Sequence, residues 1–510
     1  MASPSSSSTS RWNPVIKPQP SDKETRRFPC KFFYRQTAPA GILFRRADLL
    51  LLLASGSTNR QRYKSAMCDF FIEHAYDLEC RDATRGFSNC CERKQRPLVQ
   101  ALKSAAQQAV SCFHFPGHNR GKAAPSSMSS LTGLGTFVHD LPELPELDDL
   151  FSPSGAILDA QRKASELFGS SRTWFLVNGT TCGIQASIMA SCSQAKHLSY
   201  LGILIFRLYR VWFYPVLYQS ISRRPFRVSP RVPRTALEQG ADLAVQSSHK
   251  VLSSLTQSSM LHSKGELVDA DRVSRCLQML QSSSPSYLLL ASLDAARAQL
   301  SDNPEIFGKA LDMSAEAKKH LSLIPGISVL GLSSFDSAFP AIDPLRITVG
   351  FSRLNISGYV ADEIVSSEHH IVCELVGTRS QTFAVNLGTR KEDIQRLVLS
   401  MKHLSSDFYQ ANEGKTSLKS GVCAPLGTSS MQLTPRDAFF AKKRKVLIGE
   451  SLGKICGELI CPYPPGIPVL VPGEVITEDA LSYLLDVRNM GAGISGAADD
   501  KLSSMLVCDF

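Results

Sequence analysis

The stretch ADLAVQSSHKVLSSLTQSS (residues 241–259) decides the fold class of this 510-residue chain. A short apolar run, residues 242–246, leads into a cluster of hydroxyl side chains, and Lys250 lies inside that cluster, directly after His249. A lysine at the end of a strand, among small hydroxyl donors, is well placed to form a Schiff base with an aldehyde whose phosphate needs anchoring. The alternative is an ordinary surface lysine in a serine-rich loop, because lysines are commonly solvated.

A second hydroxyl-rich turn lies earlier in the chain. The apolar pattern of residues 173–177 predicts a strand, which runs into NGTTCG (residues 178–183) and then into a predicted helix over residues 184–190. The free N–H groups and the positive dipole end of a helix N-terminus bind phosphate, and threonine hydroxyls add donors. Many such turns contain Gly and Thr only to cap the helix, so the motif predicts a phosphate site or a plain cap.

Hydrophobic periodicity predicts further elements along the chain. No sustained period occurs before Pro97, where a helix is predicted to begin. The other predicted helices span residues 156–168, 273–281, 287–300, 358–367 and 391–404, and the other predicted strands span residues 345–351, 371–376 and 382–387. The resulting division is a leader and disordered linker (1–95), a large domain (96–300), a small α/β domain (301–411), a linker (412–434) and a C-terminal domain (435–510).

Composition excludes several classes of function. The net charge of +10 is spread thinly, and its short basic clusters lack the interleaved aromatics of a nucleic-acid surface. Fourteen cysteines include no CxxC pair, so we expect reduced thiols and no metal site. The apolar run at residues 49–53 is too short to span a bilayer, and we expect no membrane partner.

The first 21 residues contain no carboxylate and are rich in serine. This composition favours an organelle transit peptide, and the serine run favours chloroplast or other plastid over mitochondrion. The alternative is a disordered tail on a cytoplasmic protein.

Four segments together identify a family. FHFPGHNRG (113–121), FLVNGTTCG (175–183), GADLAVQSSHKVLSSLTQSSMLH (240–262) and CPYPPGIPVLVPGEVIT (461–477) occur in the order found in the Orn/Lys/Arg decarboxylase family, which this chain resembles. The resemblance implies an α/β fold with an aspartate-aminotransferase-type large domain, a small α/β domain and a C-terminal decarboxylase domain. It also implies pyridoxal 5'-phosphate as cofactor, a basic amino acid (arginine, lysine or ornithine) as substrate, and a homodimer or larger homo-oligomer.

The resemblance also implies roles for individual residues. Lys250 matches the lysine that holds the cofactor, and Lys250 and His249 are the expected catalytic residues. The positions that match the cofactor-phosphate contacts are Gly179, Thr180, Thr181, Ser247 and His249. A positive substrate tail needs a carboxylate near the pocket, and we take Glu474 and Asp149 as candidates, with an ordinary solvated or capping acid as the alternative for each.

Residues 194–229 depart from the family pattern. Relatives have several βα units here, with a histidine that stacks on the cofactor ring and an Asp that pairs with its pyridinium nitrogen. No Asp or Glu occurs between Gln194 and Thr235, and the only histidine there, His197, has no matching context. We interpret the stretch as sequence read through a splice or gene-model error, which leaves the large domain incomplete. The alternatives are a basic amphipathic surface helix and a membrane-associated segment at residues 198–217.

Two hypotheses for function follow. The first is a pyridoxal-phosphate-dependent decarboxylase of a basic amino acid, as in polyamine biosynthesis. The second is a catalytically impaired variant of the same enzyme, which lacks the pyridinium-pairing Asp and the ring-stacking His. An incomplete sheet would also expose unpaired strand edges, which favours aggregation.

Overall fold

The structure is a computed structural model, and it describes residues 95–191, 232–332, 341–409, 430–464 and 466–509, together with the backbone of the short hairpin β2 (Ser222–Arg223) and β3 (Phe226–Arg227). The leader at residues 1–21 and the side chains of the divergent segment 194–229 lie outside the described residues. Helices and strands alternate through the rest, which confirms the α/β fold class. The domain boundaries stay a prediction.

A three-stranded sheet lies at the centre of the large-domain elements. Its order is β1 (Arg172–Leu176), β5 (Ser259–Ser263) and β4 (Leu243–Gln246), and both pairings are antiparallel. Strands β1 and β4 therefore run parallel to each other, and their C-terminal ends meet at the edge where β5 begins. Within the described residues β4 is hydrogen-bonded to β5 alone.

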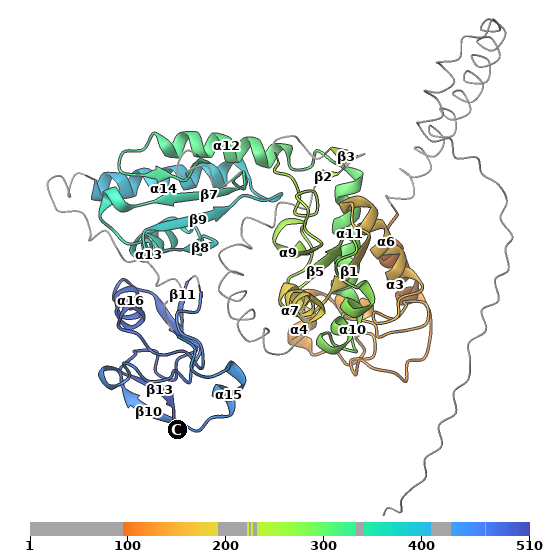
Figure 1. The fold of residues 1–510 in the computed structure, drawn as a ribbon. Helices are drawn as coiled ribbons and strands as arrows, with labels where there is room; N and C mark the ends of the chain where they lie inside the picture. The colour runs from red at the N-terminus through yellow and green to blue at the C-terminus, as the bar shows by residue number, and fades with distance from the viewer. Residues whose placement is uncertain are drawn as a thin grey trace, which may run out of the picture. The chain divides into compact units, whose positions relative to one another are not determined.

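Helices cover both faces of this sheet. Helices α3 (Pro97–Gln107), α6 (Ala156–Phe168) and α11 (Tyr287–Asp302) pack on one side, and α7 (Gly179–Ser191) and α10 (Ala270–Leu280) pack on the other (Figure 1). Alternation along β1 explains the arrangement, since successive strand side chains point to opposite faces. Phe175 joins the core on the α6 and α11 side, whereas Trp174 and Leu176 join the core on the α7 and α10 side.

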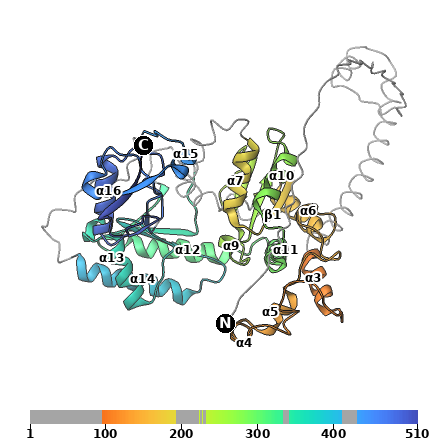
Figure 2. The same ribbon diagram turned by 90° about the horizontal axis from the view of Figure 1, so that it is seen from below.

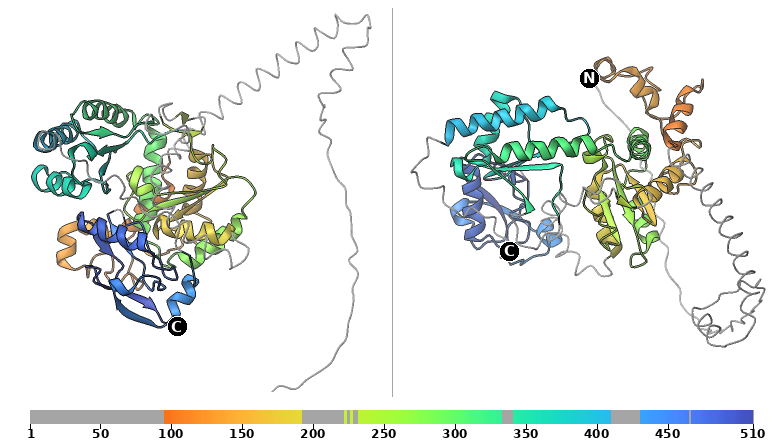
Figure 3. Two further views of the ribbon diagram at one scale, coloured as in Figure 1. Left: turned by 60° about the vertical axis from the view of Figure 1, so that its left-hand side comes forward. Right: turned by 90° about the horizontal axis from the view of Figure 1, so that it is seen from above.

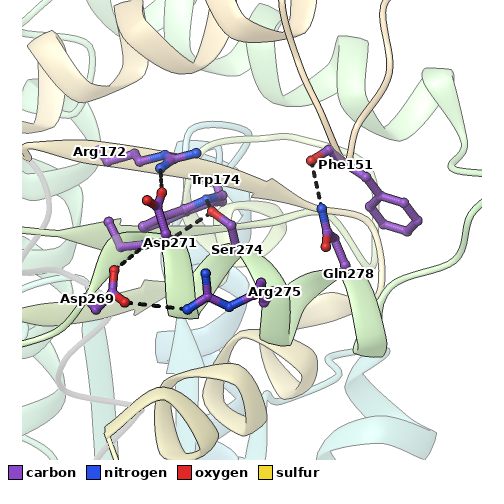
Figure 4. Close-up of polar contacts among 9 residues, drawn as sticks. Phe151, Arg172, Trp174, Asp269, Asp271, Ser274, Arg275 and Gln278 are labelled. Atoms are coloured by element: carbon purple, nitrogen blue, oxygen red, sulfur yellow. Dashed lines mark hydrogen bonds and ion pairs between the residues drawn. The ribbon is translucent and has the colours of Figure 1, made fainter. Parts of the chain in front are cut away.

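Polar contacts fix β1 to α10. Arg172 forms an ion pair of 3.3 Å with Asp271, and its guanidinium lies 5.0 Å from the centre of the Trp174 ring. The Trp174 indole N–H donates to Ser274 Oγ at 3.0 Å (Figure 4). Buried indole N–H groups need such a partner. These contacts lie at the start of β1, so they set the position of the strand whose far end enters the NGTTCG turn.

A second sheet has the order β6 (Ser328–Val329), β7 (Arg346–Gly350), β9 (Ser380–Ala384) and β8 (Leu375–Val376). Helices α12 (Gly308–Ser322), α13 (Gly358–His369) and α14 (Lys391–Phe408) pack against it (Figure 2). Residues of β7 alternate between buried and half-buried, which is the pattern of a strand with one face on a core. We refer to these four strands, their connecting segments and the three helices together as the small sheet.

The C-terminal elements are two pairs of antiparallel strands and two helices. Strand β10 (Lys443–Leu447) pairs with β13 (Ser504–Cys508), and β11 (Cys461–Tyr463) pairs with β12 (Gly493–Ser495). Helix α15 (Pro435–Phe440) precedes them and α16 (Glu478–Asn489) joins them (Figure 3). No helix among the described residues is long and apolar enough to cross a bilayer.

The predicted elements differ from the observed ones at several points. The helix predicted from residue 184 already begins at Gly179, so the NGTTCG turn is the first turn of α7. The strand predicted over residues 371–376 is reduced to β8, and α13 ends at His370, which has a left-handed backbone conformation. Lys250 lies in the short helix α9 (Ser248–Val251), one turn beyond the end of its strand.

A buried carboxylate anchors α3 to the rest of the chain. Asp294 on α11 has no exposed surface, and its Oδ2 atom accepts hydrogen bonds from the backbone N–H groups of Leu98 (3.0 Å) and Val99 (3.4 Å). These are unpaired donors at the N-terminus of α3. Arg297, equally buried, forms an ion pair with Asp294 and donates to the Gln95 carbonyl at 2.6 Å.

Replacing Asp294 by Ala should lower the free energy of unfolding by about 3–5 kcal/mol, because it leaves the Arg297 charge buried without its partner. Asp302→Ala is the matched control on the same helix, since the Asp302–Arg96 pair is exposed and should contribute less than about 1 kcal/mol. Urea unfolding measures both. Equal losses in the two variants would contradict the anchoring role.

A second buried carboxylate lies at the start of β7. The Asp343 side chain is 3% exposed, and its Oδ2 atom lies 3.8 Å from Arg346 Nε, which is too far for a hydrogen bond. Its Oδ1 atom accepts from the Leu345 N–H at 2.9 Å. Burial outweighs these contacts and raises the pKa of Asp343 to about 6.

This raised pKa predicts a pH dependence of stability. The folded state holds the Asp343 proton more tightly than the unfolded state. Protonated Asp343 therefore adds to the free energy of unfolding below about pH 4, and this contribution is lost as the pH rises through about 6. The loss should be about 3 kcal/mol. In Asp343→Asn the unfolding free energy should lack this fall, as measured by urea titrations across the window. Parallel curves for the two proteins would contradict the assignment.

Candidate active site

Three segments converge at the edge of the first sheet where β1 and β4 end and β5 begins. Gly179 is the first residue of α7 and has a backbone φ of +77°, a conformation that favours glycine. A Cβ atom built there would meet nothing closer than the Gln257 carbonyl oxygen at 3.9 Å. The backbone of this turn is therefore open on the side where a ligand would approach the helix N-terminus.

Buried hydroxyls line the same turn. Thr180 Oγ1 lies 2.5 Å from Ser247 Oγ and 2.8 Å from Ser259 Oγ, and all three side chains are buried. We call Thr180, Ser247 and Ser259 the hydroxyl cluster. Its members come from α7, the end of β4 and the start of β5. Together with the free N–H groups of α7, the cluster offers the donors that bind a phosphate.

The structure brings two of the predicted phosphate-site residues together and adds a third hydroxyl. Thr180 and Ser247 are in contact although 67 residues separate them, and their role at a phosphate stays a prediction. Ser259 was not predicted as a site residue; the signal was its place in the hydroxyl-rich stretch around Lys250. Thr181 lies exposed on the first turn of α7.

Lys250 is held one turn away from the hydroxyl cluster. Its backbone N–H donates to the Ser247 carbonyl at 3.0 Å, as part of α9. Its side chain is one-third exposed, and Nζ donates to Glu374 Oε1, on the small sheet, at 3.2 Å. His249 Nδ1 donates to the Ser258 carbonyl at 2.9 Å, which fixes the tautomer when the ring is neutral.

A chain of buried polar side chains links the three strands next to the site. Thr173 Oγ1 lies 2.9 Å from His262 Nδ1, and His262 Nε2 lies 3.0 Å from Gln246 Oε1. Complete burial lowers the pKa of His262 to about 3, so the ring is neutral. The chain links β1, β5 and β4 and ends at the residue before Ser247. It therefore fixes the strand end from which Ser247 and α9 extend.

The two candidate substrate carboxylates have structural hydrogen bonds in their own segments. Asp149 is exposed, and its Oδ1 atom accepts from the Phe151 N–H at 2.8 Å. Glu474 is 3% exposed, and its Oε2 atom accepts from the Val471 N–H at 3.1 Å. The carboxylate that organises the loop at residues 146–151 is Asp148, which accepts hydrogen bonds from the Asp149 N–H and from four backbone N–H groups around the start of α6.

Comparison with known protein families identifies the family of this chain. The model of the Orn/Lys/Arg decarboxylase major domain matches residues 96–199 and 227–337, and that of the family's C-terminal domain matches residues 423–500. These matches cover more than half of the chain. The chain belongs to the Orn/Lys/Arg decarboxylase family. Residues 200–226, inside the divergent segment, lie between the two parts of the major-domain match.

Curated relatives and solved structures agree with this membership. An arginine decarboxylase of Halalkalibacterium halodurans is 28% identical over 490 residues, covering 81% of this chain and 98% of its own length. A lysine decarboxylase of Hafnia alvei is 24% identical over 332 residues, covering 50% of this chain and 45% of its own. The structure of the constitutive lysine decarboxylase of Escherichia coli has a TM-score of 0.64 and 18% identity, covering 85% of this chain and 84% of that one.

Family membership makes this an amino-acid decarboxylase, and the cofactor of the family is pyridoxal phosphate. The residues present fit that cofactor at two points. The hydroxyl cluster at the N-terminus of α7 suits its phosphate, and the Lys250 amine suits its aldehyde. No group of three His, Cys, Asp or Glu side chains in the described ranges is arranged to hold a metal ion.

The hydroxyl cluster should contribute to stability. Thr180→Val keeps the shape of the side chain but leaves two buried serines without their partner, so the cofactor-free protein should lose about 1–3 kcal/mol of unfolding free energy. Thr181→Val, on the exposed side of the same turn, should change it by less than about 0.5 kcal/mol. Equal effects in urea titrations would show that the cluster contributes nothing.

Proposed function

We propose that this chain decarboxylates a basic amino acid (arginine, lysine or ornithine) to the corresponding amine, as in polyamine biosynthesis, with pyridoxal phosphate held at Lys250. One observation supports this most strongly. The backbone of Lys250, in the short helix α9, is hydrogen-bonded to Ser247 of the hydroxyl cluster, so one small molecule with an aldehyde and a phosphate would meet both residues in the same region.

Each residue then has a role. Thr180, Ser247 and the backbone at Gly179 hold the phosphate, Thr181 adds a donor on the open side of the turn, and His249, fixed by the Ser258 carbonyl, is the further residue on the phosphate side. Bound pyridoxal phosphate supplies an acceptor for the electron pair that remains when CO₂ departs. The chain's own task is to hold that acceptor and orient the carboxylate for loss.

The substrate is the finer part of the proposal. Relatives that align over nearly their full length include arginine decarboxylases, so arginine is the first substrate to assay. Glu474 and Asp149 are the proposed partners of the positive tail. Glu474 lies in the proline-rich segment, where it is 3% exposed and accepts a hydrogen bond from the Val471 N–H at 3.1 Å.

We also propose that the chain acts as a homodimer or larger oligomer. Residues 111–139 lead into and form helices α4 (Ser126–Thr132) and α5 (Leu134–His139), in which no residue is buried. Phe113 is 99% exposed, Phe115 84% and Leu131 78%. Large apolar side chains exposed together mark a protein interface, and a second copy would cover them. Sedimentation should show a species of at least twice the chain mass of 55.8 kDa.

The alternative of an impaired variant is supported by the divergent segment. Without a carboxylate on the ring nitrogen, the cofactor would be a weaker electron acceptor. A transcript read across residues 190–235 separates the cases. An in-frame stretch encoding an Asp-Glu-Ala-His segment would mean that the gene encodes a normal decarboxylase of which this chain is an imperfect reading.

The central experiment compares the purified wild-type protein with Lys250→Arg. Arginine keeps the charge near Glu374 but cannot attack an aldehyde. The wild type should gain a visible absorbance band with pyridoxal phosphate and release CO₂ from at least one of the three amino acids, and Lys250→Arg should do neither. Lys264→Arg, the control, should behave as the wild type.

Two other outcomes are decisive. A band that persists in Lys250→Arg would remove Lys250 from the site. Uptake of the cofactor without CO₂ release from any of the three substrates would favour the impaired variant. We also propose that residues 1–21 direct the protein to plastids. Fused to a fluorescent protein, this segment should carry it to plastids in plant cells.

A further inference from the structure

The Lys250 side chain reaches from the first sheet to the small sheet. Its Nζ atom donates to Glu374 Oε1 at 3.2 Å, and each side chain is about one-third exposed. The two residues are 124 positions apart in sequence. An ion pair of this kind is weaker than a buried one and stronger than a fully solvated one.

Glu374 is held in place by its own surroundings. Its backbone N–H donates to the Thr382 carbonyl on β9 at 2.9 Å. The Cys373 thiol, whose pKa burial raises to about 12, donates to Asp362 Oδ1 on α13 at 3.3 Å, and Gln381 Nε2 donates to the same oxygen at 3.0 Å. The segment before β8 is thus fixed to both β9 and α13, and it presents the Glu374 carboxylate to the lysine.

We infer that Glu374 is the counter-ion of Lys250 and restrains the reactivity of its amine toward a carbonyl carbon. This inference deepens the proposed function, on which it rests for the identity of the aldehyde. Attack requires the ammonium to lose a proton to solvent. The neutral nitrogen then bonds to the aldehyde carbon, and the carbonyl oxygen leaves as water, so that an imine forms. An ammonium paired with a carboxylate loses that proton less readily, and opening the contact releases the amine.

Glu374 is therefore a positioning residue that acts through Lys250. Before loading, it orients Nζ toward the small sheet and slows attack. Movement of the small sheet relative to α9 would open or close the contact, and so would couple the availability of Lys250 to that movement.

The test uses the cofactor-free full chain with Glu374→Gln, and Glu368→Gln as the matched control. Glu368 is an exposed glutamate of α13, on the same unit. Each protein is treated briefly with an amine-acylating reagent, and acylation of Lys250 and Lys264 is followed by peptide mass spectrometry. Lys250 should react about fivefold faster in Glu374→Gln, the factor expected for loss of one partly exposed ion pair. Lys264 should react equally in all three proteins.

The second readout is the rate at which the visible band forms after pyridoxal phosphate is added. It should rise by a similar factor in Glu374→Gln and stay unchanged in Glu368→Gln. Acylation of Lys250 at the wild-type rate, or slower, in Glu374→Gln would overturn the inference. Faster acylation without a band in any of the proteins would support the counter-ion role and contradict the proposed function.

Discussion

The antiparallel pairing of β4 with β5 is the constraint on which the candidate site depends. It places the end of one strand beside the start of the other, so that Ser247 and Ser259 face the first turn of α7. Thr180 completes the hydroxyl cluster only because β1 pairs with the far side of β5 and delivers the chain to the same edge. Loss of this register would separate the hydroxyls, the helix N-terminus and Lys250 at once.

Two kinds of burial maintain this arrangement. Apolar side chains of β1 pack into the hydrophobic cores on both faces of the sheet, and this packing fixes the strand between its helices. The neutral His262 then links the three strands from within, with Thr173 on one side and Gln246 on the other. This buried polar chain favours one register, because a slipped strand would break the hydrogen bonds that His262 forms with Thr173 and Gln246.

Local patterns in the sequence predicted much of this and missed what depends on distant partners. The span of α6 was predicted without error, because its apolar period ends at a glycine cap, Gly169. The strand β5 and the role of Ser259 were missed, since a run of serines and one histidine has no strand period of its own. Its burial comes from β1 and β4. The contact between Lys250 and Glu374 was equally beyond the sequence, because 124 residues separate the two charges and only the folded small sheet brings them together.

The central claim is that Lys250 is the residue to which pyridoxal phosphate becomes attached. The most direct test is to incubate the purified chain with the cofactor, reduce it with borohydride and map the modified peptides by mass spectrometry. A phosphopyridoxyl group on the peptide that contains Lys250, at near one per chain, is the predicted result. Modification spread over other lysines, with Lys250 unmodified, would contradict it.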